Sequence, residues 1–266
     1  MDDSPDIDRS FGAQSVASDE RRARIRRVFE AVAPRYDLMN DLMSGGLHRG
    51  WKRTLARRVA ACSGQVIDLA GGTGDVARLL LGPGRQVTVI DPSTAMMDIG
   101  RRRRGMQGVH WLHGEAEQLP LADASVDLLV VSFGLRNATQ LFRSLQEVRR
   151  VLKPGAHFAC LEFSRPRAWL APAYDLHSRW VIPALGAAVA RHPEAYRYLV
   201  ESIRRFPDQA EFATLLRQAG FAEVHFEDLL FGIACLHFGT CPHEFARVRT
   251  SPHESARVST SQQQFA

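Results

Sequence analysis

Short apolar runs alternate with amphipathic segments through the middle of the chain. Five of these runs are rich in β-branched and other apolar residues, as is typical of strands. They lie at 65–70, 86–91, 109–115, 126–133 and 157–164. Several lack clean polar alternation, which is typical of parallel strands that helices cover on both faces. The pattern predicts an α/β fold with a doubly wound, mostly parallel sheet, whose ligands bind beyond the carboxyl ends of the strands.

Capping and helix-breaking residues mark the later elements. Lys153-Pro154-Gly155 ends a helix before the fifth strand, and Asp208 with Glu211 forms a capping box at the start of another helix. Two more apolar segments, 222–230 and 231–238, follow with almost no spacer between them. Such close spacing predicts an antiparallel pair at one edge of the sheet, which brings the predicted sheet to seven strands.

The two ends of the chain lack this pattern. Residues 1–20 are polar and aperiodic, which predicts a disordered N-terminal arm. Near the other end, PHEFARVRTS (242–251) is followed directly by PHESARVSTS (252–261), a tandem repeat too short to build a core. We therefore expect one domain over 21–240 and a flexible, repeat-containing tail over 241–266.

Composition limits which binding partners and which cellular compartment are expected. The formal net charge is +5, but no basic segment is interleaved with aromatic residues, so nucleic-acid binding is not expected. The four cysteines form no CxxC and pair with no histidine at metal-ligand spacing, which favours a reducing compartment and no metal site. The start lacks the layout of a secretory signal, and the apolar run VIPALGAAVA is much shorter than the ~20 residues that span a bilayer. We expect a cytoplasmic protein, either free or peripheral at the inner face of the membrane.

The stretch VIDLAGGTGDVARLL contains the most specific local motif, a strand that runs into a glycine turn and a helix that starts near Asp75. Glycines let a backbone turn sharply and approach a ligand closely. The spacing is not the GxGxxG of dinucleotide sites, and Asp75 would repel a pyrophosphate but attract a cationic ligand. Asp91 ends the next strand, about 20 residues on, where a carboxylate accepts both ribose hydroxyls. The pattern favours S-adenosylmethionine over NAD, and the alternative is an ordinary glycine turn with a capping aspartate.

The predicted cofactor contacts come from the ends of four strands. Glu115, at the third strand, would accept from the adenine amino group or be simply solvated, and Ser132 would touch the methionine part. The full predicted set is Asp68, Gly71, Gly72, Thr73, Gly74, Asp91, Glu115, Ala116 and Ser132. Arg136 and Asn137 follow the fourth strand, so we expect them beside the reacting methyl group. The alternative for Arg136 is a helix cap or a residue that faces solvent.

Two longer stretches are more specific than a glycine turn: YDLMNDLMSGGLHRGW (36–51) and RVLKPGAHFACLEFS (150–164). Together with LAGGTGD, SFGLRN and YRYLVESIRRFPDQ, they resemble the ubiquinone/menaquinone biosynthesis C-methyltransferase family. The resemblance covers roughly residues 24 to 240. Two departures are small: Ala156 stands where the family usually has glycine, and Glu115 where it commonly has aspartate. The resemblance implies a class I S-adenosylmethionine-dependent methyltransferase with a Rossmann-like sheet.

The implied reaction moves a methyl group from S-adenosylmethionine to a ring carbon of a polyprenylated benzoquinol or demethylmenaquinol in respiratory quinone biosynthesis. A quinol carbon becomes a good nucleophile when a ring hydroxyl loses its proton, and the resemblance implies that Arg136 takes part in that proton abstraction. Because the pKa of arginine exceeds ~12, we expect Arg136 to stabilise the phenolate or to hold the water that takes the proton. Asn137 would orient the same oxygen.

The resemblance also implies an N-terminal helical lid over 21–60 and a helical insert over 166–206. Tyr36, in the lid, is predicted to act catalytically, either by facing the sulfonium cation with its ring or by accepting through its hydroxyl. The predicted substrate contacts are Met39, Met43, His48, Trp51, Phe133, Tyr196 and Arg197. The alternatives are a helical hairpin packed on the sheet for the lid, core packing for the two methionines and a structural hydrogen bond for His48.

The insert is apolar and aromatic, with Trp180 and several arginines along it. This composition suits a prenyl-chain groove with peripheral membrane contact, and it equally suits a homodimer interface or a place in a quinone-biosynthesis complex. Three other functions stay open. They are a methyltransferase for a different aromatic acceptor, an NAD-dependent dehydrogenase, which the glycine spacing disfavours, and a non-catalytic scaffold of a quinone-biosynthesis complex.

Overall fold

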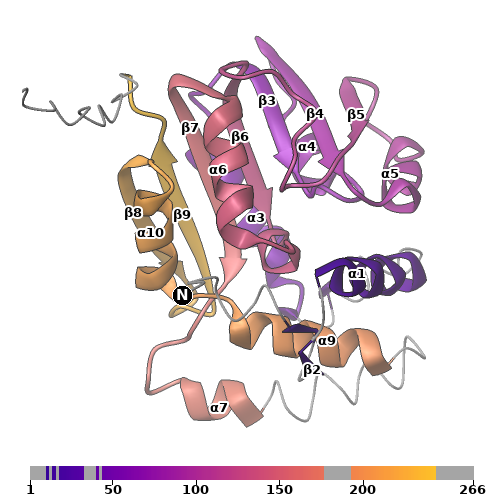
Figure 1. Ribbon diagram of the computed structural model, residues 1–266, viewed down its shortest axis with the longest axis vertical. Coiled ribbons are helices and arrows are strands. Elements are labelled where there is room, and N and C mark those ends of the chain that lie inside the picture. Colours follow the sequence, from indigo (N-terminus) through magenta and orange to yellow (C-terminus); the bar gives the residue numbers. More distant parts are fainter. Residues whose placement is uncertain are drawn as a thin grey trace, which may run out of the picture.

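The computed structural model describes residues 10–11, 14–15, 18–32, 40–41, 44–176 and 193–243. Seven strands form one sheet with the order β5-β4-β3-β6-β7-β9-β8 (Figure 1). Their bounds are β3 (Gly64–Leu69), β4 (Arg85–Asp91), β5 (Val109–His113), β6 (Val126–Ser132), β7 (Leu152–Phe163), β8 (Ala222–Leu229) and β9 (Ala234–Thr240). A separate antiparallel pair joins β1 (Ser10–Phe11) to β2 (Gln14–Ser15).

Helices cover both faces of the sheet, with α6 and α10 in front and α3 and α4 behind in the view of Figure 1. Their bounds are α1 (Ser18–Val32), α3 (Leu47–Arg58), α4 (Asp75–Leu80), α5 (Thr94–Arg101), η3 (Leu135–Asn137), α6 (Leu141–Val151), α7 (Ala171–Leu176), α9 (Pro193–Arg205) and α10 (Gln209–Gln218). Within the described ranges, none of these helices combines the length and the apolar character that crossing a membrane requires.

The strand order places a ligand crevice at β3. This strand pairs in parallel with β4 on one side and with β6 on the other, and the chain reaches β6 only after it has built β5 at the far edge. Such a reversal leaves a crevice at the carboxyl ends of the central strands, where doubly wound folds bind ligands. Strand β9 runs antiparallel between β7 and β8. This confirms the predicted fold class and the antiparallel pair at the edge.

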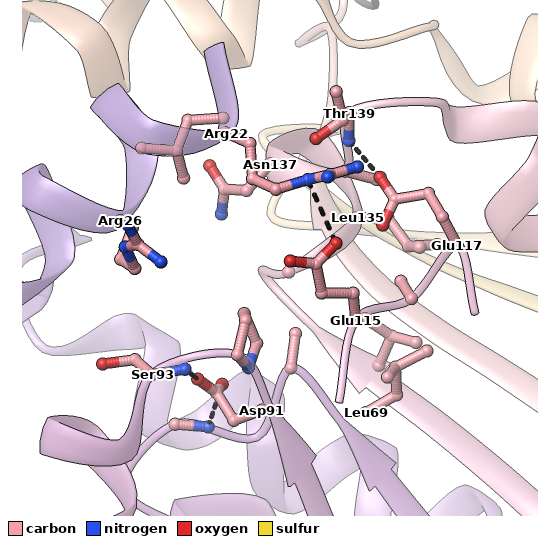
Figure 2. A pocket seen from close by; sticks show the side chains of 18 of the residues that line it. Arg22, Arg26, Leu69, Asp91, Ser93, Glu115, Glu117, Leu135, Asn137 and Thr139 are labelled. Atoms are coloured by element: carbon pink, nitrogen blue, oxygen red, sulfur yellow. Dashed lines mark hydrogen bonds and ion pairs between the residues drawn. The ribbon is translucent and has the colours of Figure 1, made fainter. Parts of the chain in front are cut away.

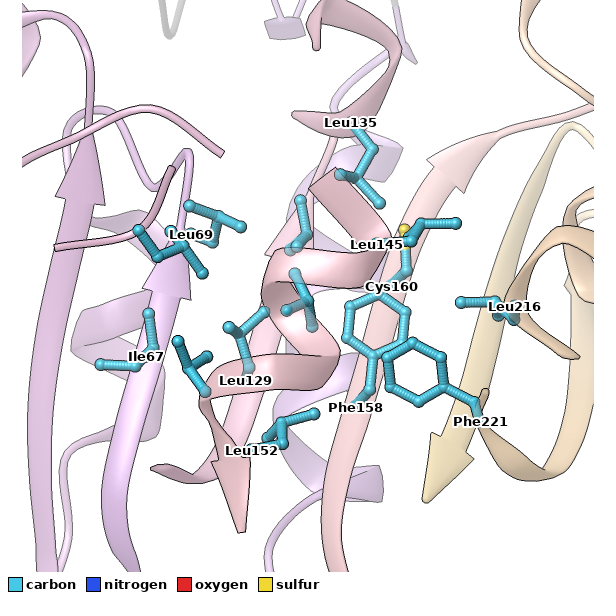
Figure 3. Close-up of a cluster of buried hydrophobic side chains, with 14 of the residues drawn as sticks. Ile67, Leu69, Leu129, Leu135, Leu145, Leu152, Phe158, Cys160, Leu216 and Phe221 are labelled. Carbon is cyan, nitrogen blue, oxygen red and sulfur yellow. The ribbon is translucent and has the colours of Figure 1, made fainter. Parts of the chain in front are cut away.

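Two apolar layers hold the sheet between its helices. Along β3, Val66 faces α3 and α4, whereas the next residue, Ile67, faces α6 and α10, and both are almost completely buried. The second layer includes Leu145 of α6, Leu216 of α10 and the rings of Phe158 and Phe221, which contact each other at a tilt (Figure 3). Because both faces of the central strands are covered, their sequences are continuously apolar rather than alternating.

The predicted boundaries differ most from the structure at three places. Strand β7 begins at Leu152, directly after α6, so Lys153-Pro154-Gly155 ends the helix but forms an irregular start of the strand, with a register shift against β6. Strand β9 begins only at Ala234, because the residues before it form a turn in which Phe231 and Gly232 have positive φ. The strand pair β1–β2 and the start of α1 at Ser18 lie within the arm that was predicted to be disordered. The predicted capping box on α10 is confirmed.

Candidate active site

A pocket opens at the carboxyl ends of β3, β4 and β6, beneath α1 (Figure 2). Its floor comes from residues that follow these strands, including Gly72, Asp91 and Phe133. Its roof comes from α1, which contributes Arg22, Ile25 and Arg26. The remaining lining residues are Leu69, Ala70, Pro92, Ser93, Met96, His113, Glu115, Ala116, Glu117, Val131, Gly134, Leu135, Asn137, Ala138 and Thr139.

The glycine turn after β3 is built so that its backbone forms one wall of the pocket. A Cβ atom on Gly71 would lie 2.8 Å from the carboxyl carbon of Asp68, which only glycine avoids. The Asp68 carboxylate is buried under the turn, where its Oδ2 accepts a 2.8 Å hydrogen bond from the Ala77 amide and so anchors the start of α4. Burial raises the pKa of Asp68 to about 7. In this arrangement Asp68 supports the turn from below.

Asp91 links the end of β4 to the glycine turn. Its Oδ2 accepts a hydrogen bond from the Gly72 amide and its Oδ1 accepts one from the Ser93 amide, each at 2.8 Å (Figure 2). A carboxylate oxygen has more than one acceptor site, so both oxygens keep capacity toward the pocket that Asp91 lines. Burial raises the pKa of Asp91 to about 6 despite these two bonds.

Asp75, expected to attract a cationic ligand, is neutralised by the chain itself. Its Oδ2 lies 3.2 Å from Nζ of Lys52, and its Oδ1 lies 2.6 Å from Nη1 of Arg103. These two cations hold the pKa of Asp75 below its ordinary value, although burial opposes them. The ion pairs tie α3 and the residues after α5 to the start of α4, so Asp75 serves the packing of the turn.

A second loop, after β6, brings Arg136 and Asn137 to the opposite wall. Phe133 adopts a left-handed conformation with φ of 56°, which ends β6 abruptly and starts η3. Asn137 lines the pocket, but the Arg136 side chain turns inward beneath it and is buried. The Arg136 guanidinium packs against the ring of Phe163, with Cζ 5.6 Å from the ring centroid.

Glu162 of β7 is the buried partner of Arg136. Nη1 of Arg136 donates to Oε2 of Glu162 at 3.0 Å, and it also donates to the carbonyl of Phe133. Oε1 of Glu162 accepts from the Arg136 amide at 3.3 Å. Burial raises the pKa of Glu162, and the adjacent guanidinium opposes that rise. Among the residues that the structure describes, Nε of Arg136 has no hydrogen-bond partner.

Two helices distant in sequence hold η3 in place. Arg21 of α1 is buried and donates to the carbonyls of Arg136 and Ala138. Tyr198 of α9 donates from its hydroxyl to Oδ1 of Asn137 at 2.9 Å. The backbone and the side chain of this loop are therefore fixed from different directions.

Charged groups also connect the pocket's roof and rim. Nε of Arg22 in α1 lies 3.0 Å from Oε2 of Glu115, which follows β5. Glu117, two residues further on, is buried and accepts from the amides of Thr139 and Gln140. Glu117 thereby holds the loop before α6, whereas Glu115 links the rim to α1.

The structure brings part of the predicted site together. The predicted residues that line the pocket are Gly72, Asp91, Glu115, Ala116, Phe133 and Asn137. The predicted residues that do not line it are His48, Trp51, Asp68, Gly71, Thr73, Gly74, Ser132 and Arg136. Tyr36, Met39 and Met43 lie outside the described residues, and so do the side chains of Tyr196 and Arg197 in α9.

Two residues of the predicted lid have definite structural contacts. Trp51 of α3 is buried against Phe133 and Phe163, with ring centroids 6.3 and 6.1 Å away, so it supports the pocket floor. His48 is also buried, and its Nε2 lies 2.9 Å from Oδ1 of Asp41. Burial lowers the pKa of His48. His48 thus makes the structural hydrogen bond that was the alternative to a substrate contact.

Several site residues were not predicted from the sequence. Arg22 and Arg26 lie in α1, in which no site residue was predicted. Glu162 carried a usable signal, because a single carboxylate within the apolar run 157–164 requires a buried partner. Tyr198 lies in a stretch quoted for the resemblance, but no sequence pattern indicates that its hydroxyl contacts Asn137.

The strand order and the pocket at its switch point define the class I methyltransferase fold, a Rossmann-like α/β architecture. A crystal structure of a SAM-dependent methyltransferase from Thermotoga maritima, described as a possible histamine N-methyltransferase, has the same fold. It superimposes with a TM-score of 0.61 at 21% identity over 82% of this chain and 99% of that one.

The chain belongs to the ubiE/COQ5 methyltransferase family, whose model matches residues 15–241, and it is therefore an enzyme of the methyltransferase class. Two relatives are named ubiquinone/menaquinone biosynthesis C-methyltransferase UbiE. The protein from Rubrivivax gelatinosus is 60% identical over 90% of this chain and 96% of its own length. The protein from Caulobacter vibrioides is 47% identical over 86% of this chain and 96% of its own length. The family expected from the sequence is confirmed.

Proposed function

We propose that this enzyme transfers a methyl group from S-adenosylmethionine to a ring carbon of a polyprenylated quinol, either a benzoquinol or demethylmenaquinol, in respiratory quinone biosynthesis. The observation that carries this proposal is a single pocket with Asp91 and the glycine turn on one wall and Asn137 on the other. The names of the relatives support the same reaction.

The residues of the first wall fit S-adenosylmethionine. Both oxygens of Asp91 keep acceptor capacity toward the pocket, which suits the two hydroxyls of a ribose. Met96 and Ala116 offer apolar contact beside it for the adenine, and Glu115 and Arg22 would close over that base. When bound, the cofactor supplies an electrophilic methyl group on a positively charged sulfur. Leu69 and Val131 would keep water from that sulfur.

The residues of the second wall suit a quinol that must lose a proton. Asn137 lines the pocket and would donate to a ring oxygen there. Arg136 lies one layer deeper, and its unpaired Nε supports a role through a water molecule that accepts the hydroxyl proton. Because Glu162 balances its charge, Arg136 would hold that water without repelling the sulfonium.

Peripheral membrane contact is also proposed, because a polyprenyl chain is dissolved in the bilayer. The turn before β9 lies at the same edge of the sheet as the pocket, since Ala234 pairs with Phe163 at the end of β7. Here Trp169 and Phe231 are exposed, with their rings edge to face and their centroids 5.1 Å apart, and Leu230 is exposed as well. Exposed aromatic and leucine side chains of this kind insert into the interfacial layer of a membrane. Trp180, in the same insert, lies outside the described residues.

The proposal is tested by complementation of a bacterial mutant that lacks quinone C-methylation, with lipid extracts analysed for the demethylated precursors. The full-length chain should restore methylated ubiquinone, menaquinone or both, and the products identify the accepted ring. Purified enzyme with S-adenosylmethionine should give the same product from the reduced quinone. Failure to methylate either quinol, with cofactor binding intact, would redirect the proposal to another aromatic acceptor.

A further inference from the structure

The side chain of Asn137 is held by a residue 61 positions later in the chain. Tyr198 is buried in α9, and its hydroxyl donates to Oδ1 of Asn137 at 2.9 Å. Asn137 itself is half-buried and lines the pocket. Figure 2 shows its side chain directed into the open space, with the nitrogen end of the amide on the side of the cavity.

We propose that Tyr198 is a positioning residue that fixes the Asn137 amide in one orientation, so that Nδ2 donates to an ionised ring oxygen of the acceptor. This inference rests on the proposed quinol methylation and names the form of the acceptor that the pocket selects. An asparagine amide has one accepting end and one donating end. Since Tyr198 occupies the accepting end, the donating end is the one presented to the substrate.

The environment of Tyr198 keeps this orientation fixed across the working pH range. Burial raises the pKa of Tyr198 to about 12, so its hydroxyl keeps its proton and remains a donor. The backbone of Asn137 is fixed independently, because its amide donates to the carbonyl of Gly134 at 3.0 Å and Arg21 donates to the carbonyls on either side. These contacts hold the loop backbone in place, so the orientation of the side-chain amide depends on the hydrogen bond from Tyr198.

The consequence is a preference for charge on the acceptor oxygen. A neutral quinol hydroxyl that needed to donate its proton to Asn137 would meet Nδ2, because the carbonyl end of the amide is turned toward Tyr198. A phenolate oxygen would receive a hydrogen bond that strengthens as negative charge develops on it. The pair Tyr198–Asn137 therefore favours the ionised quinol, which is the form whose ring carbon attacks the methyl group.

The test uses the full-length enzyme with S-adenosylhomocysteine and a prenylated nitrophenol, whose phenolate absorbs visible light. The wild type should lower the apparent pKa of the bound nitrophenol relative to the same compound in detergent micelles. Tyr198→Phe keeps the ring and removes the hydroxyl, so it should return that pKa toward the micelle value. Asn137→Asp replaces the donor by a negatively charged oxygen and should raise the pKa of the bound nitrophenol above its value in micelles.

Turnover provides the second measurement. Tyr198→Phe should lower kcat for demethylmenaquinol by roughly tenfold or more. This is part of the about 10²–10³-fold decrease in kcat that follows the loss of a donor to a developing oxyanion. Its affinity for S-adenosylmethionine and its thermal midpoint should stay close to those of the wild type. The matched control is Tyr174→Phe, which removes a hydroxyl from a half-buried tyrosine in α7.

The outcomes separate the inference from the proposed function. If Tyr198→Phe leaves the nitrophenol pKa unchanged, or if both tyrosine variants shift it equally, the orientation of Asn137 does not select charge and the inference is wrong. If the wild type methylates no quinol but still lowers the nitrophenol pKa through Tyr198, the inference stands and the acceptor is a different phenol.

Discussion

Nη1 of Arg136 lies 3.0 Å from Oε2 of Glu162, and each side chain is less than 4% exposed. This ion pair crosses from the loop after β6 to the end of β7, and Glu162 also accepts from the amide of Phe163 at 3.2 Å. The left-handed Phe133 between the strand and the loop is a conformation that costs free energy by itself. The buried pair fixes the loop that carries Asn137 and so offsets that cost.

Substitution of Glu162→Gln should destabilise the protein strongly, because it leaves the buried guanidinium without a counter-charge. Loss of one partner from a buried pair costs about 3–5 kcal/mol in the free energy of unfolding. Urea unfolding monitored by circular dichroism would measure this loss. The control is Asp98→Asn, which breaks an exposed pair with Arg101 and should cost less than ~1 kcal/mol. Equal effects of the two substitutions would mean that the Arg136 pair contributes no more than a surface contact.

Arg136→Lys should separate chemistry from cofactor binding. The ammonium keeps the charge but loses Nε and the forked geometry that spans Glu162 and the Phe133 carbonyl. We expect kcat to fall by about 10² or more, while the Kd for S-adenosylmethionine changes less than ~3-fold. Single-turnover methylation and isothermal calorimetry measure the two quantities. A parallel loss of both would make Arg136 a residue that shapes the cofactor pocket.

Cofactor binding should weaken in acid as Asp91 takes up a proton. The pKa of Asp91 is raised to about 6, and the ionised carboxylate is the better acceptor for ribose hydroxyls. The Kd should therefore rise up to about tenfold per pH unit below that value, and Asp91→Asn should bind weakly with little dependence on pH in the same range. Calorimetric titration from pH 5 to pH 8 checks both curves.

The same shift predicts how the free protein responds to pH. Because the folded pKa of Asp91 lies above its ordinary value of 3.8, the folded state binds more protons than the unfolded state between these two values. The contribution of Asp91 to the free energy of unfolding therefore decreases as the pH rises from about 4 to about 6. The free energy of unfolding of the wild type, relative to that of Asp91→Asn, should therefore fall as the pH rises through that window, and a constant difference would contradict the raised pKa.

Local sequence patterns predicted the strands, the glycine turn and Asp91, because these features depend on residues close together in the chain. Contacts between distant segments were not accessible in this way. The approach of Tyr198 to Asn137 and of Arg22 to Glu115 depends on how α9 and α1 pack against the sheet. A short motif indicates which residue type stands at a strand end, but not that the Arg136 side chain turns away from the pocket.

Arg22 and Glu115 should control how quickly the cofactor leaves, because their ion pair joins α1 to the rim of the pocket. Both side chains are partly exposed, so the ion pair contributes only about 0.2–1 kcal/mol to the stability of the contact between α1 and the rim. Arg22→Ala should therefore hardly change the free energy of unfolding. Release of S-adenosylhomocysteine should accelerate by up to about 5-fold, and the effect should vanish at high salt. Stopped-flow fluorescence measures this rate. Arg24→Ala, on the same helix with its partner Glu20, is the control, and an equal acceleration there would mean that α1 acts only through its overall stability.

Trp169 and Phe231 should determine access to a quinol in a membrane but not the chemistry itself. Each exposed ring that enters the interfacial layer contributes about 1.5–3 kcal/mol to the free energy of membrane binding. The double variant Trp169→Ala, Phe231→Ala should therefore bind anionic phosphatidylglycerol vesicles at least about tenfold more weakly than the wild type. Methylation of a short-chain quinol in solution should be unchanged, whereas methylation of a long-chain quinol in vesicles should fall. Leu79→Ala, an exposed leucine on α4, should alter neither. If the double variant still binds vesicles as the wild type does and instead changes its oligomeric state in sedimentation, these side chains form a contact between protein chains, and the long-chain substrate reaches the pocket by another surface.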